Sequence, residues 1–345
     1  MLTDRPNPRQ QSLDAIAAKI FTEPALARKQ CIELLEQARL GADGKTFIAA
    51  AVQYSLIEDQ LGDAHAALKL LSEAMAYAQE FHLIHEIPVI LEQMGCCYYS
   101  LARYPQALQC WRQCAMLCGN QASMSKTRGL ALIGLGRICD AAGNNELAVK
   151  MHQSGHQLLQ ITDDAYLITM AKINWAVNLQ KLQQYDAACI LLSDALVLSQ
   201  QNHLPHHIAE ILFRLSQIAI VQQQDGLAES YIEDGMLTLS ETPYHWVEVN
   251  LLAEWARLQA RQGKLIEALA TVKRGLELAQ TDDFKNLEMV LLQQAQGYAN
   301  DMGLSLIADE YQRKASFLLL HLQDEIPASE QLDLDGLNAL ALPGL

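Results

Sequence analysis

The sequence is dominated by an alanine that returns at a nearly constant interval. Successive members of this series are 40 or 41 residues apart. A fixed period of about 20–50 residues is typical of solenoids and other repeat architectures, in which each unit packs on its neighbours. The sequence therefore predicts one structural unit repeated seven times. The repeated alanines are Ala67, Ala107, Ala148, Ala188, Ala228, Ala268 and Ala308.

Two further columns of small residues keep step with the alanines. The residue seven positions later is always small: Ala74, Cys114, Gly155, Ala195, Gly235, Gly275 and Ala315. The residue twelve positions earlier is Ser55, Gly95, Gly136, Ala176, Ser216, Ala256 or the exception, Gln296. Large residues precede most of these: Tyr54, Met94, Leu135, Trp175, Leu215 and Trp255, but Ala295. Small residues let two helices approach closely, and large neighbours fill the adjoining grooves. Each repeat is therefore predicted to be a pair of antiparallel helices.

Helical periodicity and turn residues agree with this interpretation. Apolar residues recur three and four positions apart, as in Leu265, Leu269, Val272 and Leu276. Four repeats have glycine five positions before the marker alanine, where it suits the left-handed residue that ends a helix. These are Gly62, Gly143, Gly263 and Gly303; the equivalent residues Ala102, Gln183 and Gln223 leave three turns less defined. No long run alternates with period two, so the predicted fold class is all-α.

The repeat resembles the tetratricopeptide repeat. Residues 91–115, LEQMGCCYYSLARYPQALQCWRQCA, and residues 251–279 carry the resemblance, which extends over about residues 48–321. The period is 40 rather than about 34 residues, and the proline that commonly closes the unit is missing. The resemblance implies a right-handed α-α superhelix of about seven to eight helix-turn-helix repeats. Units of this long period resemble those of bacterial signalling and regulatory proteins.

The ends of the chain differ from the repeats. We expect residues 1–11 to be disordered and residues 12–46 to form capping helices, because Ala27 lies 40 residues before Ala67. Residues 47–321 are predicted to form the seven repeats. Residues 322–345 mix acids with leucines, a composition that favours disorder but also suits a linker, a docking peptide or a strand of chain laid back on the solenoid.

Charge and hydropathy exclude several classes of partner. The net charge is −15, whereas nucleic-acid binding needs a clustered basic surface. Anionic membrane surfaces are disfavoured for the same reason. No stretch of about 18 apolar residues predicts a membrane span, and the N-terminus has no apolar signal core. These features predict a cytoplasmic protein with neither nucleic-acid nor membrane partners.

Cysteines and histidines offer metal or redox sites, which we weigh against packing. Six cysteines crowd into residues 96–139: Cys96, Cys97, Cys110, Cys114, Cys118 and Cys139. Because Cys114 occupies an always-small column, burial as a small hydrophobe is the favoured interpretation. The loops FHLIHEI and NHLPHHI contain His82, His85, His203, His206 and His207, which internal duplication explains better than metal binding. His152, where other repeats have apolar residues, is expected to be an interior histidine. No metal or other cofactor is predicted.

The sequence shows no catalytic constellation, so function is expected on a surface. It lacks a phosphate-binding loop, an HExxH motif and a nucleophile elbow. In the families that the chain resembles, the first helix of each unit lines a concave face that binds peptides or partner helices. Carrying those positions over gives the candidate binding residues Arg137, Asn174, Lys181, Arg214, Gln217, Arg257 and Arg261. Glu92, Asp140, Glu210 and Glu254 map to the same face, so the predicted groove has mixed charge.

Two functions from different classes follow, with a third in reserve. The first is a non-catalytic adaptor that binds a protein or peptide ligand, with an acidic or C-terminal carboxylate segment suited to the arginines. The second is a sensory module that controls an effector such as a diguanylate cyclase, histidine kinase or transcription factor. The third is a metal or redox site at the cysteines. Oligomeric state, including a homodimer, stays open, and the first function is favoured.

Overall fold

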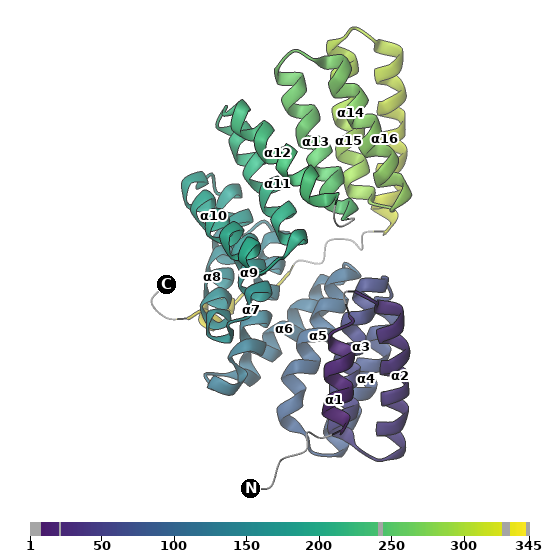
Figure 1. Cartoon of the computed structure of the whole chain (residues 1–345), viewed down its shortest axis with the longest axis vertical. Helices are drawn as coiled ribbons and strands as arrows, with labels where there is room; N and C mark the ends of the chain where they lie inside the picture. The colour runs from purple at the N-terminus through teal and green to yellow at the C-terminus, as the bar shows by residue number, and fades with distance from the viewer. Residues whose placement is uncertain (1–7, 21, 241–243, 326–331, 343–345) are drawn as a thin grey trace. The chain divides into compact units, whose positions relative to one another are not determined.

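Helices make up nearly all of the regular structure. The computed structural model describes residues 8–20, 22–240, 244–325 and 332–342 (Figure 1). Within these residues there are sixteen α-helices, four short 3-10 helices and no strand. Inter-residue contacts divide the chain into two compact units, residues 1–162 with 332–345 and residues 163–331. The all-helical prediction and the pairing of helices in each repeat are confirmed.

The first unit contains helices α1 to α8. They are α1 (Pro8–Ala17), α2 (Pro24–Leu40), α3 (Gly44–Leu61), α4 (Ala64–Glu80), α5 (Ile87–Ser100), α6 (Tyr104–Cys118), α7 (Ser125–Ala141) and α8 (Asn145–Leu159). The 3-10 helices η1 (Ile84–Glu86), η2 (Ala122–Met124), η3 (Gln160–Thr162) and η4 (Leu337–Leu340) also belong to this unit. The hairpins are therefore α3–α4, α5–α6 and α7–α8, preceded by α1 and α2.

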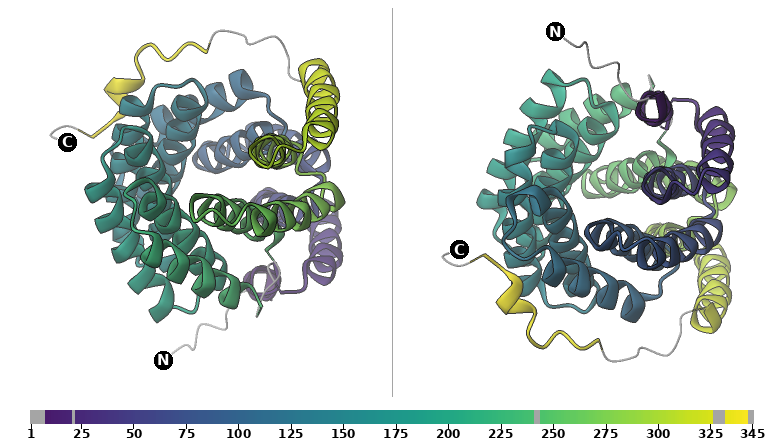
Figure 2. Two further views of the ribbon diagram at one scale, coloured as in Figure 1. Left: turned by 90° about the horizontal axis from the view of Figure 1, so that it is seen from above. Right: turned by 90° about the horizontal axis from the view of Figure 1, so that it is seen from below.

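The second unit contains four hairpins. Its helices are α9 (Ala165–Lys181), α10 (Tyr185–Gln201), α11 (Pro205–Val221), α12 (Asp225–Leu239), α13 (His245–Arg261), α14 (Leu265–Thr281), α15 (Lys285–Asp301) and α16 (Ser305–Glu325). In both units, the two helices of each hairpin pack together, and each second helix packs on the first helix of the next hairpin (Figure 2). The first helices also contact one another, α3–α5–α7 in one unit and α9–α11–α13–α15 in the other. We call α9, α11, α13 and α15 the first-helix layer of the second unit.

The small-residue columns lie where helices cross most closely. Six of the marker alanines are completely buried, and Ala308 is 2% exposed. A Cβ atom added to Gly155 on α8 would lie 2.9 Å from the carbonyl oxygen of Gly129 on α7 and 2.8 Å from Ile133. Backbone atoms cannot yield at that distance, so only glycine fits this crossing. The period of the sequence therefore corresponds to the regular spacing of these close helix–helix contacts.

The turns within hairpins share one backbone conformation whether or not they contain glycine. Gly62, Gly143, Gly263 and Gly303 have φ between 73° and 81°. The equivalent residues Ala102, Gln183 and Gln223 have φ of 56°, 60° and 62°. These three turns are therefore left-handed too, although a side chain in this region is strained by about 1–2 kcal/mol.

Replacing Gln223 by glycine is expected to stabilise the chain. Glycine removes the left-handed strain, and its larger entropy in the unfolded chain offsets part of that gain. We expect the free energy of unfolding to rise by about 0.5–1 kcal/mol in urea titrations. The control is Gln222→Gly, since Gln222 has φ of −79° and should lose stability. Equal losses in both variants would contradict a left-handed Gln223.

Two segments at the ends of the chain differ from the sequence-based expectation. Residues 8–11, expected to be disordered, form the start of α1, because Pro8 is suited to the first turn of a helix and Leu13 and Ile16 are buried. Residues 1–7 lie outside the described residues. At the other end, α16 continues to Glu325, beyond the predicted end of the last repeat. Within the described residues, no helix is long and apolar enough to cross a membrane.

Candidate functional site

The candidate residues are divided between the two units. Arg137 lies on α7 of the first unit. Asn174 and Lys181 are on α9, Arg214 and Gln217 on α11, and Arg257 and Arg261 on α13, all in the second unit. All six residues of the second unit therefore belong to its first-helix layer.

Arg137 has a local set of partners in the first unit. Its guanidinium carbon lies 3.9 Å from the centre of the Tyr99 ring on α5, a cation–π arrangement. Burial raises the pKa of Asp59 on α3, and the positive charge of Arg137 offsets part of that rise. Burial also raises the pKa of Glu92, which is 5% exposed. Arg137 thus balances acidic side chains of its own unit.

The two candidates on α9 are placed differently from the arginines. The side-chain amide of Asn174 donates to the carbonyl oxygen of Met170 one turn earlier on the same helix, at 2.9 Å. That bond uses one of its two N–H groups. Lys181 is the last residue of α9 and is exposed. Among the described contacts, Asn174 does not join the network on α11 and α13.

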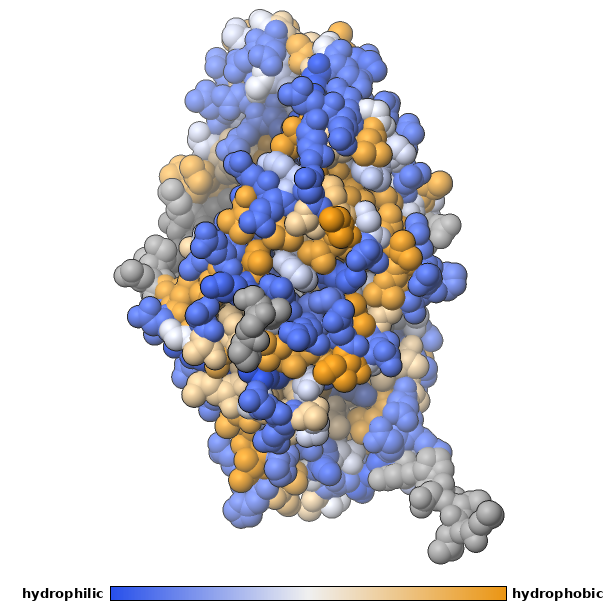
Figure 3. Space-filling view, turned by 90° about the vertical axis from the view of Figure 1, so that its left-hand side faces the viewer, coloured by the Kyte–Doolittle hydropathy of each residue, from blue (hydrophilic) through white to orange (hydrophobic). Residues whose placement is uncertain are grey.

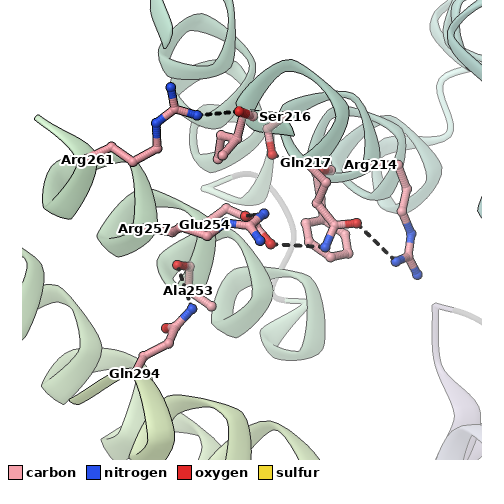
Figure 4. Close-up of polar contacts among 10 residues, drawn as sticks. Arg214, Ser216, Gln217, Ala253, Glu254, Arg257, Arg261 and Gln294 are labelled. Carbon is pink, nitrogen blue, oxygen red and sulfur yellow. Dashed lines mark hydrogen bonds and ion pairs between the residues drawn. The ribbon is translucent and has the colours of Figure 1, made fainter. Parts of the chain in front are cut away.

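Arg214, Gln217 and Arg257 are joined in one polar network by Glu254 (Figure 4). Arg214 Nη1 lies 3.5 Å from Gln217 Oε1, and Gln217 Nε2 donates to Glu254 Oε1 at 3.0 Å. The other carboxylate oxygen of Glu254 accepts from Arg257 Nη2. Glu254 is 6% exposed, so the arginine and the glutamine stabilise a buried charge. Three of the predicted residues therefore form a continuous chain across α11 and α13.

Arg261 extends the network towards α12. Arg261, labelled in Figure 4, donates to the backbone carbonyl of Ile220 at the end of α11. It also pairs with Asp225 at 3.1 Å. On the other side, Gln294 of α15 donates to the carbonyl oxygen of Ala253 at 3.4 Å. Polar contacts thus connect three successive first helices.

Aromatic rings support the arginine at one end of the network. The guanidinium carbon of Arg214 lies 4.6 Å from the Phe213 ring centre and 5.7 Å from that of Trp246. The two rings are nearly perpendicular, with centroids 6.1 Å apart. Arg214 also lies 3.5 Å from Glu210 one turn earlier on α11. Such contacts restrict the rotamers of a long side chain and orient it before any ligand arrives.

The electrostatics of the network differ from a simple positive groove. Each arginine has a carboxylate beside it: Glu210 for Arg214, Glu254 for Arg257 and Asp225 for Arg261. The local charge is therefore balanced, as the mixed-charge expectation for this face requires. Two donors nevertheless lack an acceptor among the described residues, namely the buried Nε atoms of Arg214 and Arg257.

Comparison with known proteins identifies solved structures of similar architecture. Neither a protein-family model nor a curated protein sequence matches the chain. The apo form of RapI matches with a TM-score of 0.66 and 12% identity, over 80% of this chain and 99% of RapI. A signal transduction ATPase with a tetratricopeptide repeat sensor, from Pyrococcus horikoshii, matches with a TM-score of 0.61 and 15% identity, over 93% of this chain and 52% of that one. NprR in complex with its cognate peptide NprX matches with a TM-score of 0.54 and 13% identity, over 91% and 100%.

The fold is that of tetratricopeptide-repeat proteins. Identities of 12–15% support a shared fold and leave function to be derived from the residues of this chain. The first-helix layer of the second unit is the part of this tetratricopeptide-repeat fold where most of the candidate residues gather.

The cysteines are mostly core residues of the tetratricopeptide-repeat hairpins. Six of the eight are buried, and Cys96 and Cys189 are partly buried. Burial raises the pKa of Cys110 to about 11 and that of Cys139 to about 12, which keeps these thiols protonated at neutral pH. Across the described ranges, no three His, Cys, Asp or Glu side chains are grouped as metal ligands.

The histidine loops have different environments despite their similar sequences. His82 and His203 both have positive φ, of 54° and 53°, and are exposed at equivalent turns between hairpins. His207 is 7% exposed and its ring centre lies 4.5 Å from that of Tyr166. Burial lowers the pKa of His207 to about 4, so this ring is neutral at physiological pH. His207 is therefore a core residue of α11.

Sequence reasoning missed two contributors to the network. Asp225 is on α12, a second helix, and was outside the residues carried over from first helices. Trp246 was not singled out, because which side chain an aromatic ring contacts depends on how neighbouring helices cross.

Proposed function

We propose that the chain is a non-catalytic peptide- or protein-binding module. Its site is the first-helix layer of the second unit, centred on Arg214, Gln217 and Arg257. The observation that carries the proposal is the set of pre-positioned arginines Arg214, Arg257 and Arg261, whose side chains are 18%, 41% and 34% exposed. A guanidinium group carries five N–H donors, so a ligand that supplies oxygen acceptors can bind those that the network leaves exposed.

The chemistry of the site indicates the ligand. Arginine donors suit carboxylate oxygens and peptide carbonyls, and Gln217 can both donate to and accept from a peptide backbone. The balancing carboxylates Glu210 and Glu254 hold the guanidinium groups in place before binding. An extended segment with at least one acidic residue or a C-terminal carboxylate fits this set of donors. The complex of NprR with its cognate peptide supports peptide binding by a protein of this fold.

The test uses peptides selected on the full chain. A display library of random 12-residue peptides is panned against the protein, and enriched peptides are measured by fluorescence polarisation. The variant Arg214→Lys with Arg257→Lys retains both charges and removes the forked guanidinium donors. A charge-assisted hydrogen bond is worth about 1.5–3 kcal/mol, so we expect the double variant to bind at least ~10-fold more weakly.

A matched control makes the same exchange elsewhere in the second unit. Arg274 on α14 and Arg313 on α16 are exposed, and their replacement by lysine should leave peptide affinity unchanged. Failure to enrich any peptide would contradict the proposal. Equal affinities for the wild type and the Arg214→Lys/Arg257→Lys variant would place binding on another surface.

A sensory role is the second candidate. The match to a chain whose tetratricopeptide repeat is named a sensor supports it. In that case peptide binding at Arg214 and Arg257 would control an effector, and the same panning experiment would identify the signal. A binding-deficient variant would then lose regulation of the effector while the effector's unregulated output stayed intact.

A further inference from the structure

One surface of the first unit is covered by a segment from the far end of the chain. Exposed apolar residues elsewhere include Ile190 on α10 (65% exposed) and Leu237 on α12 (70% exposed). The face in Figure 3 shows apolar and hydrophilic side chains interspersed, which is normal for a protein surface. By contrast, residues 332–342, which we call the C-terminal segment, pack beside α8 (Figure 1).

The C-terminal segment inserts leucines into the core of the first unit. Leu337 is completely buried in the cluster that contains Trp111 of α6 and Met151 of α8. Leu332, Leu334, Leu340 and Ala341 are partly buried against the same cluster. The helix η4, which begins at Leu337, contacts both α6 and α8. The composition of residues 322–345 favoured disorder, whereas this spacing of leucines gives residues 332–342 a continuous apolar face.

Basic side chains surround these leucines. Arg112 of α6 lies 3.5 Å from the Asp333 carboxylate and also donates to the Asp333 carbonyl oxygen. Arg128 of α7 donates to the carbonyl oxygen of Leu340 at 3.2 Å, and Lys150 of α8 donates to the side-chain oxygen of Asn338 at 3.4 Å. Cations from three consecutive helices thus meet a segment rich in acids and carbonyl groups, in a chain whose net charge is −15.

Backbone geometry adds specificity to the contact. Gly336 has φ of 76°, a conformation that favours glycine and that directly precedes the buried Leu337. The backbone N–H of Leu342 donates to Ser154 Oγ at 3.0 Å, and Ser154 on α8 is completely buried. This bond gives the buried Ser154 hydroxyl a partner and fixes the position of the segment's backbone on α8.

We propose that the surface of α6, α7 and α8 is a second peptide-binding site, and that its ligand is the chain's own C-terminal segment. The ligand class is a short acidic segment with leucines at the positions of Leu334, Leu337 and Leu340. This site consists of residues of the first unit and includes none of the arginine network of the second unit. A result that contradicts one proposal therefore leaves the other unaffected.

The segment is bound reversibly. Only Leu337 is fully buried, and the carboxylate that pairs with Arg112 is on a side chain that is 68% exposed, where ion pairs contribute little. As a separate peptide, residues 332–342 therefore bind weakly. Covalent connection through residues 326–331 supplies an effective concentration on the order of 1 mM, which keeps a weak ligand bound.

The experiment converts the intramolecular contact into an intermolecular one. In the full chain, residues 326–331 are replaced by the recognition sequence of a site-specific protease, and binding of a fluorescent peptide of residues 329–345 is measured before and after cleavage. We expect a dissociation constant of about 1–100 μM after cleavage and dilution, and at least ~10-fold weaker binding to the uncleaved chain. Circular dichroism before and after cleavage monitors the fold.

Two variants test the chemistry of the site. A peptide with Leu337→Asp should bind at least ~10-fold more weakly, because a charge replaces the buried leucine. The receptor variant Arg112→Glu/Lys150→Glu should also weaken binding, whereas Lys29→Glu/Lys69→Glu, at exposed lysines of α2 and α4, should not. Equal peptide binding before and after cleavage overturns the proposal, as does absence of binding after cleavage. A stable dimer in light scattering that Leu337→Asp dissociates would show that a second copy supplies the segment, and would also overturn it.

Discussion

Replacement of Trp111 by alanine is expected to lower the free energy of unfolding by about 3–5 kcal/mol. Trp111 is on α6, is 1% exposed and is among the largest fully buried side chains of the described residues. Its indole N–H also donates to the Glu92 carbonyl oxygen on α5 at 3.2 Å. The variant therefore loses apolar burial and a hydrogen bond together, and urea titration followed by circular dichroism measures the loss. A loss below about 1 kcal/mol would contradict this packing, given the usual cost of such a cavity.

The reason for so large an effect is that two neighbouring helices are shaped around this ring. A Cβ atom on Gly95 of α5 would lie 2.5 Å from the indole nitrogen, and one on Gly134 of α7 would lie 2.3 Å from the ring. Both distances are far shorter than van der Waals contact. Glycine in the middle of a helix normally costs up to about 1 kcal/mol relative to alanine, so these glycines are tolerated because they admit the indole.

A double-mutant cycle tests this size compensation. Gly134→Ala alone should destabilise the chain by about 1–3 kcal/mol through overpacking. In the Trp111→Ala background the same change should stabilise by up to about 1 kcal/mol, because the space is empty and alanine favours the helix. The control is Gly297→Ala on α15, where a Cβ atom meets nothing within 4 Å. It should stabilise both backgrounds equally, and the absence of a sign reversal at Gly134 would rule out the proposed compensation.

The same compensation explains which parts of the fold the sequence could predict. The columns of small residues could be recognised in the sequence because each repeat places a small residue opposite a residue whose size varies between repeats. In the second and third repeats, Gly95 faces Trp111, and a Cβ on Gly136 would lie 2.4 Å from the His152 ring. His152 is 1% exposed, which agrees with an interior histidine. The repeat in the sequence therefore predicts how the hairpins pack, because every unit packs against neighbours of the same kind.

Contacts that do not repeat could not be predicted in this way. The partner of Arg261 is Asp225, whose distance from Arg261 depends on how α12 and α13 cross, a quantity that the period does not contain. The C-terminal segment lies on α6 and α8 although about two hundred residues separate Arg112 from Asp333 in sequence. The assignment of candidate residues from first-helix positions likewise grouped Arg137 with Arg214 on one predicted face. The two residues belong to separate compact units.

Acidification is expected to destabilise the second unit through His207. This ring is buried on α11 against Tyr166, its Nδ1 has no hydrogen-bond partner among the described residues, and burial lowers its pKa to about 4. In the unfolded chain the pKa of histidine is about 6.5. Below pH ~6.5 the unfolded state therefore binds a proton that the folded state excludes, and stability falls as the pH falls.

The size of the effect follows from the difference between the two pKa values. Stability is fully present above about pH 7 and is lost progressively down to about pH 4, with a total loss of about 3 kcal/mol at 1.36 kcal/mol per pKa unit. Burial also lowers the pKa of the neighbouring His206, which acts in the same direction. Urea titrations at several pH values between 7 and 4.5 measure the slope.

His207→Phe isolates this contribution, because phenylalanine preserves the ring contact with Tyr166 and cannot bind a proton. All other groups titrate in both proteins, so they cancel in the difference between wild type and variant. We expect that difference to shift in favour of the variant by about 2 kcal/mol or more between pH 7 and 4.5. His65→Gln, at an exposed histidine of α4, should leave the wild-type profile unchanged. Parallel profiles for wild type and His207→Phe would show that the folded state accepts the proton, and that His207 is not buried as a neutral ring.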